Sequence, residues 1–475
     1  MVPDVIVIGG GLSGLSAAVD LVSRGSRVLL LEQRPFLGGR TYSFVDETTG
    51  DVVDNGQHLL MGCYRETRRF LKVIGSDDLA TLQPNLQIDF LYPDKGRAAL
   101  SCPPLPAPFH VLAGLLNLRT LPLRDRLKLL RVGMELLFRS SAHEERLRKI
   151  TVDEWLTQLG QTDLNKKYLW DIIAIGTLND NPTTVSALLF YRVLRAAFVG
   201  AREDSCLLVP RVGLSELLVN PAVRFIRSHG GEVRVGVEVE EILIRERRVS
   251  GIRAGDGSVV QASAYISAVP YYALPELVTK LRGSSTPEHQ NSSGVPAPTT
   301  SGTGQLPQNF DYLKAFESSP IITIHLWLDR PVIEQEFAAI LDARVQWIFN
   351  RSDILGRRSS AGRQYLSLVI SGAAEYVAME KEQLVAIAIE DLRRVLPGAE
   401  SASVVHSLVI KEKRATFSPT PEVEPLRPST DTAFENLFLA GDWTDTGLPA
   451  TIEGAVRSGF RAGRKASDFL EKLIS

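Results

Sequence analysis

The sequence predicts an α/β protein with two kinds of domain. One domain is built on a parallel sheet with a small antiparallel sheet beside it, and the other is α+β. Three observations support this fold class. An apolar strand, a glycine-rich turn and a helical stretch open the chain over residues 5–23. Short alternating strands follow at residues 231–270, and a second apolar strand at 436–440 breaks at Gly-Asp and leads toward a helix.

The opening element carries glycines in G-x-G-x-x-G spacing and is followed by a second apolar run that ends in an acid. This acid, Glu32, stands 18 residues after Gly14, close to the roughly 20 expected for a residue that binds a ribose hydroxyl. The glycines allow a tight turn and close approach of the backbone to a pyrophosphate, and the helix N-terminus favours an anion. The pattern predicts a Rossmann-type dinucleotide site for an unphosphorylated ribose, with a structural glycine turn as the alternative. The predicted contacts are Gly9, Gly11, Leu12, Ser13, Gly14, Glu32 and Gln33.

The next segment, PFLGGRTYSF, distinguishes FAD from NAD. It places Gly38, Gly39 and Arg40 where a flexible backbone and a guanidinium reach the same pyrophosphate. A simple NAD dehydrogenase has no need of this segment, so the sequence favours FAD as the cofactor. With this G-G-R the chain resembles the superfamily of flavin-containing amine oxidases and phytoene desaturases.

The resemblance extends to AGDWTD near the C-terminus. It implies that Asp442, next to Gly441, hydrogen-bonds the ribityl–pyrophosphate region. It also implies that the helix beginning near Ala450, Thr451 and Ile452 points at the flavin. The C-terminal strand is therefore expected to return to the first sheet and complete the FAD site.

Two further FAD contacts follow from the same resemblance. Val239, in the small antiparallel sheet, is expected to contact the adenine through its backbone, with a plain core position as the alternative. The loop DNGQHLLMG is expected to lie beside the flavin through Gly56, Gln57 and His58.

These features predict two domains that are discontinuous in sequence. Residues 64–205 are expected to be mainly helical, and strands at 319–332, 345–352 and 364–373 belong to the substrate domain. A Ser/Pro/Gly/Thr-rich tract at 283–308 is expected to be a flexible surface insertion. The predicted FAD domain comprises residues 1–65, 206–270 and 430–475, and the substrate domain residues 66–205 and 271–429.

Composition excludes several classes of protein. The formal net charge of −2 gives no indication of nucleic-acid binding. Cys63, Cys102 and Cys206 are too few and too scattered for a disulfide framework or a metal site, which favours a reducing cytoplasm. The N-terminus lacks a basic n-region, so no signal peptide is expected. The longest uncharged stretch, residues 98–118, contains four prolines and is not expected to span a membrane.

Segments outside the cofactor motifs resemble the hydroxysqualene dehydroxylases, among them LNDNPTTVSALLFYRVLRAAF, SPIITIHLWLDRPV and KEKRATFSPTPEVEPLRP. This resemblance implies reduction of the isoprenoid hydroxysqualene to squalene, by ionisation of an allylic C–O bond and hydride transfer from reduced FAD. A phytoene-type desaturase that uses oxidised FAD is the main alternative. An amine oxidase is a weaker one, because Thr451 stands where those enzymes place an aromatic residue. A non-catalytic isoprenoid-binding flavoprotein is the third.

Ionisation of the C–OH bond needs a proton donor, because hydroxide is a poor leaving group. His58 is the first candidate for this acid, and Tyr64 and Asp180 follow. A histidine that only hydrogen-bonds the backbone or the flavin is the alternative. The sequence carries no second nucleotide fingerprint, so the electron donor stays open between NADPH and a reductase.

Residues 109–138 predict a contact with one leaflet of a membrane. Apolar residues recur there at spacings of four and three, and basic residues border them at helical spacing. An apolar stripe with a basic border is typical of a helix in the interface of anionic lipid. A stripe packed inside the domain is the alternative. The expected location is the cytoplasm, on the inner leaflet of the cytoplasmic membrane. The stripe comprises Leu123, Leu127, Leu130, Met134 and Leu137, and the border Arg124, Lys128 and Arg131.

Overall fold

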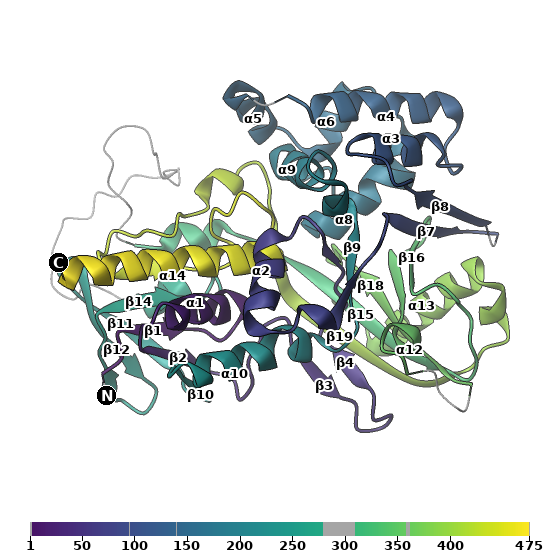
Figure 1. Ribbon diagram of the computed structural model, residues 1–475. Helices are drawn as coiled ribbons and strands as arrows, with labels where there is room; N and C mark the ends of the chain where they lie inside the picture. Colours follow the sequence, from purple (N-terminus) through teal and green to yellow (C-terminus); the bar gives the residue numbers. More distant parts are fainter. Residues whose placement is uncertain (1, 95, 139, 279–308, 358–361, 475) are drawn as a thin grey trace.

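The fold is known from a computed structural model that describes residues 2–94, 96–138, 140–278, 309–357 and 362–474 (Figure 1). The predicted insertion at 283–308 lies outside the described residues. The first domain has a five-stranded, fully parallel sheet, and the predicted α/β class is confirmed. In spatial order its strands are β10 (Glu232–Val235), β2 (Val28–Glu32), β1 (Val5–Ile8), β14 (Ala264–Ser267) and β20 (Leu437–Leu439).

Three distant segments of the chain build this sheet. β14 pairs in parallel with β1 on one side and with β20 on the other, so the C-terminal strand returns to the first sheet as predicted. Helix α14 (Ile452–Ile474) then packs alongside α1 (Leu12–Ser23), as Figure 1 shows. The two helices are so close that a Cβ atom on Gly459 would lie 2.0 Å from the Oγ of Ser16. A small antiparallel sheet completes the domain, with strands β11 (Val239–Arg245), β12 (Arg248–Ala254) and β13 (Val259–Val260).

The second domain has a seven-stranded mixed sheet between two apolar layers. Ile322 and Ile324 of its long strand β15 pack with helix α13 (Lys381–Val395) in one buried cluster, whereas Ile321 packs against the cluster of the helical layer. The period-2 alternation of strand side chains thus separates the two layers. The order is β19 (Val404–Phe417), β15 (Ser318–Leu328), β18 (Gln364–Ile370), β17 (Trp347–Asn350), β16 (Phe337–Ile340), β7 (Gln87–Tyr92) and β8 (Gly96–Ser101).

The expectation that residues 64–205 are mainly helical is wrong for residues 80–101. Strand β6 (Ala80–Leu82) pairs with β9 (Leu207–Pro210), and β7 joins the large sheet through parallel pairing with β16. Long-range pairing decides the conformation of such short segments. The rest of the region contains helices α2 (Arg65–Ile74), α3 (Phe109–Leu116), α4 (Leu123–Glu135), α5 (Ser141–Arg148), α6 (Val152–Gln158), α7 (Asp163–Asn165), α8 (Asp171–Leu178) and α9 (Ala187–Phe198).

Short elements connect the two domains. Asp54, the last residue of β4, forms a 2.8 Å ion pair with Arg351, the first residue of α12, and both side chains are buried. Asp54 also accepts hydrogen bonds from the Ser43 hydroxyl and the Leu214 N–H. One carboxylate therefore joins four segments next to the loop that carries His58. The short elements of these and neighbouring segments are β3 (Ser43–Val45), β4 (Val52–Asp54), β5 (Leu60–Met61), α11 (Leu274–Leu277) and α12 (Arg351–Ile354).

Candidate active site

The turn between β1 and α1 is as tight as its glycines predict. Gly9 has a φ of 108°, and a Cβ atom there would lie 2.8 Å from the carbonyl oxygen of Ala268. A Cβ on Gly14 would lie 1.9 Å from the carbonyl oxygen of Gly9, so the helix packs directly on the strand end. A Cβ on Gly11, by contrast, would meet no atom within 4 Å. The backbone at Gly11 therefore borders open space at the N-terminus of α1, where helix amides and the helix dipole favour an anion.

Glu32 holds this turn in place. Its Oε2 accepts a hydrogen bond from the N–H of Gly10 at 2.7 Å, and its Oε1 accepts one from the N–H of Arg34 at 2.9 Å. The residue is buried at the end of β2, whereas Gln33 is exposed. A carboxylate has about four lone-pair sites. Glu32 therefore keeps acceptor capacity for a ribose hydroxyl while it fixes the turn.

The G-G-R segment lies directly against the first glycine turn. The N–H of Gly38 donates to the carbonyl oxygen of Gly10 at 2.9 Å. Gly39, at a φ of 61°, approaches so closely that a Cβ on it would lie 3.2 Å from the Cα of Gly11. The two glycine motifs thus form one surface of bare backbone beside the same open space.

Arg40 connects this surface to the other end of the chain. Its Nη2 lies 2.7 Å from Oδ2 of Asp442, and its guanidinium also donates to the carbonyl oxygen of Ala415 on β19. Asp442 is buried and Arg40 is partly exposed. The structure therefore brings together the predicted N-terminal and C-terminal halves of the site, which are 402 residues apart in sequence.

Arg427 was not predicted, yet it positions the loop that carries Asp442. Its Nη2 donates to the carbonyl oxygens of Asp442 at 3.0 Å and Thr444 at 2.5 Å, and to the hydroxyl of Thr446 at 3.2 Å. Burial lowers the pKa of this guanidinium to about 10. Its Nη1 has no hydrogen-bond partner among the described residues. Arg427 lies in the segment KEKRATFSPTPEVEPLRP, but nothing in the spacing or composition of that segment marks this residue, so its role becomes visible only in three dimensions.

The N-terminus of α14 is capped next to this loop. Thr451 stands between Ala450 and the buried Ile452. Its hydroxyl accepts a hydrogen bond from the N–H of Gly454 at 3.1 Å. The N–H of Gly441 donates to the Oγ of Ser458 at 2.8 Å. The helix and the Gly-Asp turn are therefore fixed relative to each other, as a shared ligand site requires.

In the loop with Gly56, Gln57 and His58, one hydrogen bond defines the tautomer of the histidine. The Nδ1 of His58 lies 2.8 Å from the carbonyl oxygen of Gly56, so this nitrogen carries the proton and Nε2 is the acceptor. Burial lowers the pKa of His58 below its usual value of 6.5. Its neutral form is therefore favoured near pH 7, which opposes the predicted role as an acid. The buried Oε1 of Gln57 has no hydrogen-bond partner among the described residues.

The other two acid candidates lie on separate elements. Tyr64 precedes α2 and packs against the cluster around α1, where burial raises the pKa of its phenol. The carboxylate of Asp180, after α8, accepts hydrogen bonds from the Ser418 hydroxyl at 2.6 Å and the Asn181 N–H at 2.7 Å. Across the described residues, no hydrogen bond joins His58, Tyr64 and Asp180 to one another.

Val239 lies at the start of β11 with its side chain buried in a core cluster. The preceding segment reaches Glu32, because the N–H of Val237 donates to the Glu32 carbonyl oxygen at 2.9 Å. The side chain thus has the core position that was the alternative. The adenine contact concerns the Val239 backbone and stays a prediction.

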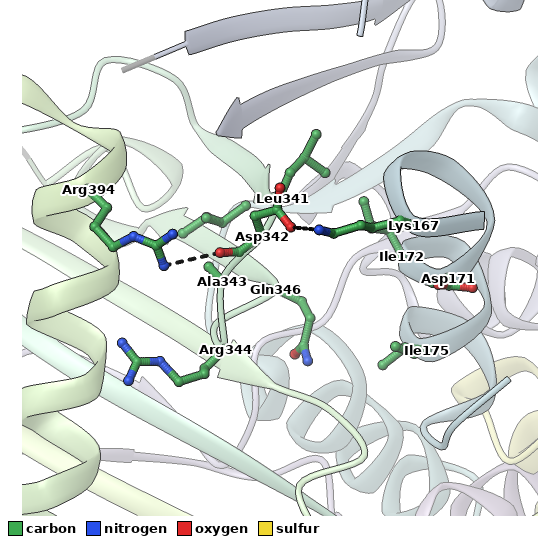
Figure 2. Close-up of a pocket in the computed structure, with 11 residues that line it drawn as sticks. Lys167, Asp171, Ile172, Ile175, Leu341, Asp342, Ala343, Arg344, Gln346 and Arg394 are labelled. Atoms are coloured by element: carbon green, nitrogen blue, oxygen red, sulfur yellow. Dashed lines mark hydrogen bonds and ion pairs between the residues drawn. The ribbon is translucent and has the colours of Figure 1, made fainter. Parts of the chain in front are cut away.

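A cavity of about 450 Å³ lies elsewhere, between α8, the turn after β16 and α13 (Figure 2). Charged side chains surround it, including the ion pair between Lys167 and Asp342, as well as Arg344 and Arg394. None of the predicted FAD contacts lines it. The cavity is therefore separate from the glycine surface.

Comparison with known proteins decides the family. The family model described as flavin containing amine oxidoreductase matches residues 12–466. The chain belongs to this family. It is 30% identical over 468 residues to a hydroxysqualene dehydroxylase of Sinorhizobium fredii, with 97% of this chain and 98% of the relative covered. It is 26% identical to a 15-cis-phytoene desaturase of an Oncidium hybrid cultivar, with 99% and 79% covered.

A solved structure of an oxidoreductase from Methanosarcina mazei has the same fold as this chain. Its TM-score is 0.70 at 18% identity, over 97% of this chain and 99% of that one. The predicted resemblance, the cofactor FAD and the enzyme class are confirmed by these relatives. The protein is an FAD-dependent oxidoreductase similar to hydroxysqualene dehydroxylases.

The described residues fit FAD. The open space at Gly11 is bordered by bare backbone from two glycine motifs, and Arg40 and Asp442 meet beside it. Arg40 would hold the pyrophosphate, Glu32 the ribose and Asp442 the ribityl chain. The individual contacts of the predicted residues with FAD stay predictions.

Proposed function

We propose that the protein catalyses the reduction of hydroxysqualene to squalene. The observation that carries this proposal is the similarity to a hydroxysqualene dehydroxylase, at 30% identity over 97% of this chain and 98% of the relative, against 26% identity and 79% of the relative for the phytoene desaturase. Cofactor motifs alone would match only short segments. The similarity therefore includes the substrate domain, which determines what an enzyme of this superfamily binds.

In the net reaction, the substrate takes up one proton and one hydride and loses one molecule of water. The allylic C–O bond breaks, the hydroxyl leaves as water after it takes a proton, and the carbon accepts a hydride. Bound reduced FAD supplies that hydride and is oxidised. An allylic cation is stabilised by resonance, but it must be kept from water until the hydride arrives.

The chain supplies an apolar environment for this step. The loop of His58 continues into Leu59, which packs against the same buried cluster as Ile173 of α8 and Ile321 of β15. Trp347 of β17 packs against this cluster as well. Apolar side chains of this kind suit contact with a long hydrocarbon and keep water away. Apolar groups around the loop also account for the lowered pKa of His58, which is caused mainly by burial.

His58 remains our candidate for the proton donor. With Nδ1 bound to the carbonyl of Gly56, its Nε2 is the nitrogen that exchanges a proton with substrate. Because its pKa is lowered, the protonated form is a minor species at pH 7. The proposal therefore requires that the reaction accelerates as the pH falls.

Product analysis tests the function. The purified holoprotein is incubated with hydroxysqualene under reducing conditions and, in parallel, with phytoene and an electron acceptor, and products are identified by mass spectrometry. Squalene from the first reaction alone supports the proposal. A desaturated product from phytoene, without squalene, would support the second candidate function, which the similarity to the Oncidium phytoene desaturase favours. No conversion of either compound would contradict both.

A further inference from the structure

Helix α4 has two apolar faces on opposite sides. Leu129 and Val132 are buried in the core of the helical layer. Leu123, Leu127 and Met134 are 64%, 52% and 63% exposed. At 100° per residue these three side chains share one stripe, about 180° from the buried pair. Of the predicted stripe, Leu130 is half-buried and the other four residues are exposed, so the alternative that the stripe packs inside the domain is wrong.

Further exposed apolar side chains lie on neighbouring segments. Phe109 begins α3, Leu137 and Phe138 follow α4, and each is about 60% exposed. The two helices are tied together, because Arg126 of α4 donates to the carbonyl oxygen of Leu116 at 2.9 Å, and they lie side by side in Figure 1. We call this surface the α3–α4 face; it comprises Phe109, Leu123, Leu127, Met134, Leu137 and Phe138.

This concentration is unusual within the molecule. Sixteen large hydrophobic side chains are exposed in the described part of the chain, and seven of them lie between residues 105 and 138. Apolar side chains scattered singly need no explanation, but a contiguous patch marks an interaction surface. The α3–α4 face therefore calls for an apolar partner.

The charge along one edge of the face indicates which partner. Arg124 and Arg131 are exposed, and Lys128 lies between them at helical spacing. Neither acid of α4 is free to offset these cations, since Asp125 is buried and Glu135, on the same edge, is bound by Arg146 at 2.5 Å. A second copy of the chain, packed antiparallel on this face about a two-fold axis perpendicular to α4, would bring cations against cations without an exposed acid of α3 or α4 to pair them. Anionic lipid headgroups, by contrast, would complement both the apolar centre and the basic edge.

We propose that the α3–α4 face docks onto the surface of an anionic lipid bilayer. In the described ranges, no helix has the length and apolar character needed to cross a bilayer. The apolar side chains would therefore enter one leaflet only, and Arg124 and Arg131 would lie among the headgroups. This geometry is that of a helix pair in the membrane interface.

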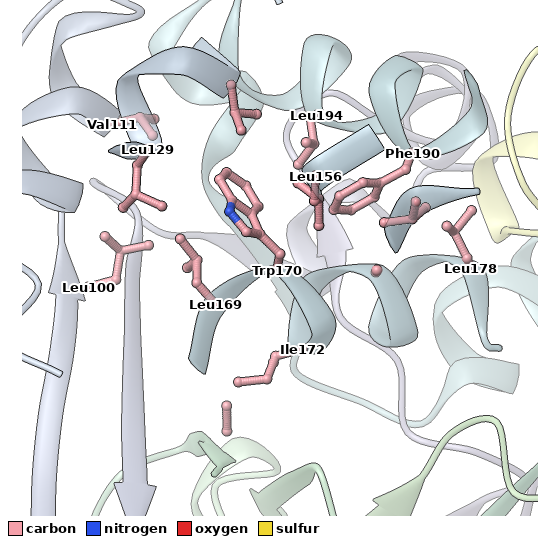
Figure 3. Close-up of a cluster of buried hydrophobic side chains, with 14 of the residues drawn as sticks. Leu100, Val111, Leu129, Leu156, Leu169, Trp170, Ile172, Leu178, Phe190 and Leu194 are labelled. Atoms are coloured by element: carbon pink, nitrogen blue, oxygen red, sulfur yellow. The ribbon is translucent and has the colours of Figure 1, made fainter. Parts of the chain in front are cut away.

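The position of the face suits a lipid-resident substrate. The buried cluster behind it includes Leu129 and runs through Trp170 and Phe190 (Figure 3), and Leu59, next to His58, packs against the same cluster. The docking face and the loop of His58 thus border one apolar region. This last point rests on the proposed function, whereas the docking itself does not.

Co-sedimentation of the holoprotein with vesicles tests the proposal. We expect little binding to phosphatidylcholine alone and strong binding when about a third of the lipid is phosphatidylglycerol. The double variant Arg124→Gln/Arg131→Gln should bind the anionic vesicles roughly 30-fold more weakly, since two cations near the surface are lost. The matched control Arg224→Gln/Arg227→Gln changes the same charge on helix α10 (Asn220–Ser228), at exposed positions, and should bind like the parent.

The apolar contribution is tested by Leu123→Gln/Met134→Gln, which should weaken binding by roughly 10-fold or more. Its control is Val235→Gln/Val405→Gln, at exposed positions on the two sheets. FAD content and melting temperature are measured for every variant, so that a folding defect is recognised.

Equal binding by the parent and both α4 variants would overturn the proposal. A concentration-dependent dimer that Leu123→Gln/Met134→Gln abolishes, without vesicle binding by the parent, would show instead that a second copy covers the face. Vesicle binding by a protein that does not convert hydroxysqualene would contradict only the proposed function.

Discussion

Glu32→Gln perturbs both the glycine turn and the ribose site. In the parent, the carboxylate accepts the N–H groups of Gly10 at 2.7 Å and Arg34 at 2.9 Å. Glutamine offers one carbonyl oxygen and one NH₂ group, so one of these N–H groups would face a donor. Loss of a buried charge-assisted hydrogen bond costs about 1–3 kcal/mol. We therefore expect the dissociation constant of FAD to rise roughly 5- to 150-fold.

The assay is titration of the flavin-free protein with FAD, followed by quenching of flavin fluorescence. The melting temperature of the flavin-free protein is measured separately, because a loosened turn lowers stability even without the cofactor. Glu47→Gln, an exposed position in the β3–β4 hairpin, makes the same chemical change away from the site and serves as the control. An FAD affinity within twofold of the parent would refute the argument that this carboxylate holds the turn and the ribose.

Three further predictions follow from the site and its surroundings. Denaturation should release all of the FAD, because residues 436–459 contain no cysteine or histidine for a covalent link; flavin retained on the precipitated chain contradicts this. His58→Ala should lower dehydroxylation per bound flavin by about 10²–10⁴-fold, with His229→Ala as the control. Burial places the pKa of His58 below 6.5, so the parent rate should rise as the pH falls below 6.5 and the variant rate should not; identical pH profiles exclude His58 as the acid. Asp54→Asn leaves Arg351 buried without its ion-pair partner, and chemical denaturation should show a loss of about 3–5 kcal/mol in the free energy of unfolding. A loss below about 1 kcal/mol would mean that this pair does not stabilise the fold.

The cofactor half of the site could be predicted because its signals are local. Gly9 and Gly14 are required by a turn whose geometry their own spacing defines, and Glu32 follows at the distance that one strand–helix–strand unit sets. The contact between Arg40 and Asp442 was predictable only through a family resemblance, since 402 residues separate them.

Residues that act through long-range contacts left no pattern to recognise. Nothing in the local spacing marks Arg427 or Arg351, and their roles depend on partners that the fold brings to them. The surroundings of His325 of β15 likewise depend on long-range contacts. It is 1% exposed, its Nδ1 lies 2.8 Å from the Tyr365 hydroxyl, and burial lowers its pKa to about 3. In the sequence it is simply one histidine in an apolar strand.

Two features of the region from residue 64 to residue 205 could not be predicted from spacing: the strands near its start and the buried face of α4. Residues 87–92 are too short for their pattern to outweigh helical neighbours, and their parallel pairing with β16 decides that they form a strand. In α4, Leu123 and Leu127 recur as regularly as Leu129 and Val132, so spacing alone cannot say which face is buried. The packing of α4 on the helical layer answers that question.

The most direct test of the central claim is an anaerobic single turnover. The FAD of the purified protein is reduced, oxygen and excess reductant are removed, and hydroxysqualene is added while flavin absorbance is followed. If the protein reduces hydroxysqualene, the oxidised flavin spectrum returns and one molecule of squalene forms per flavin. Reduced flavin that persists in the presence of hydroxysqualene, with no squalene formed, would contradict that claim.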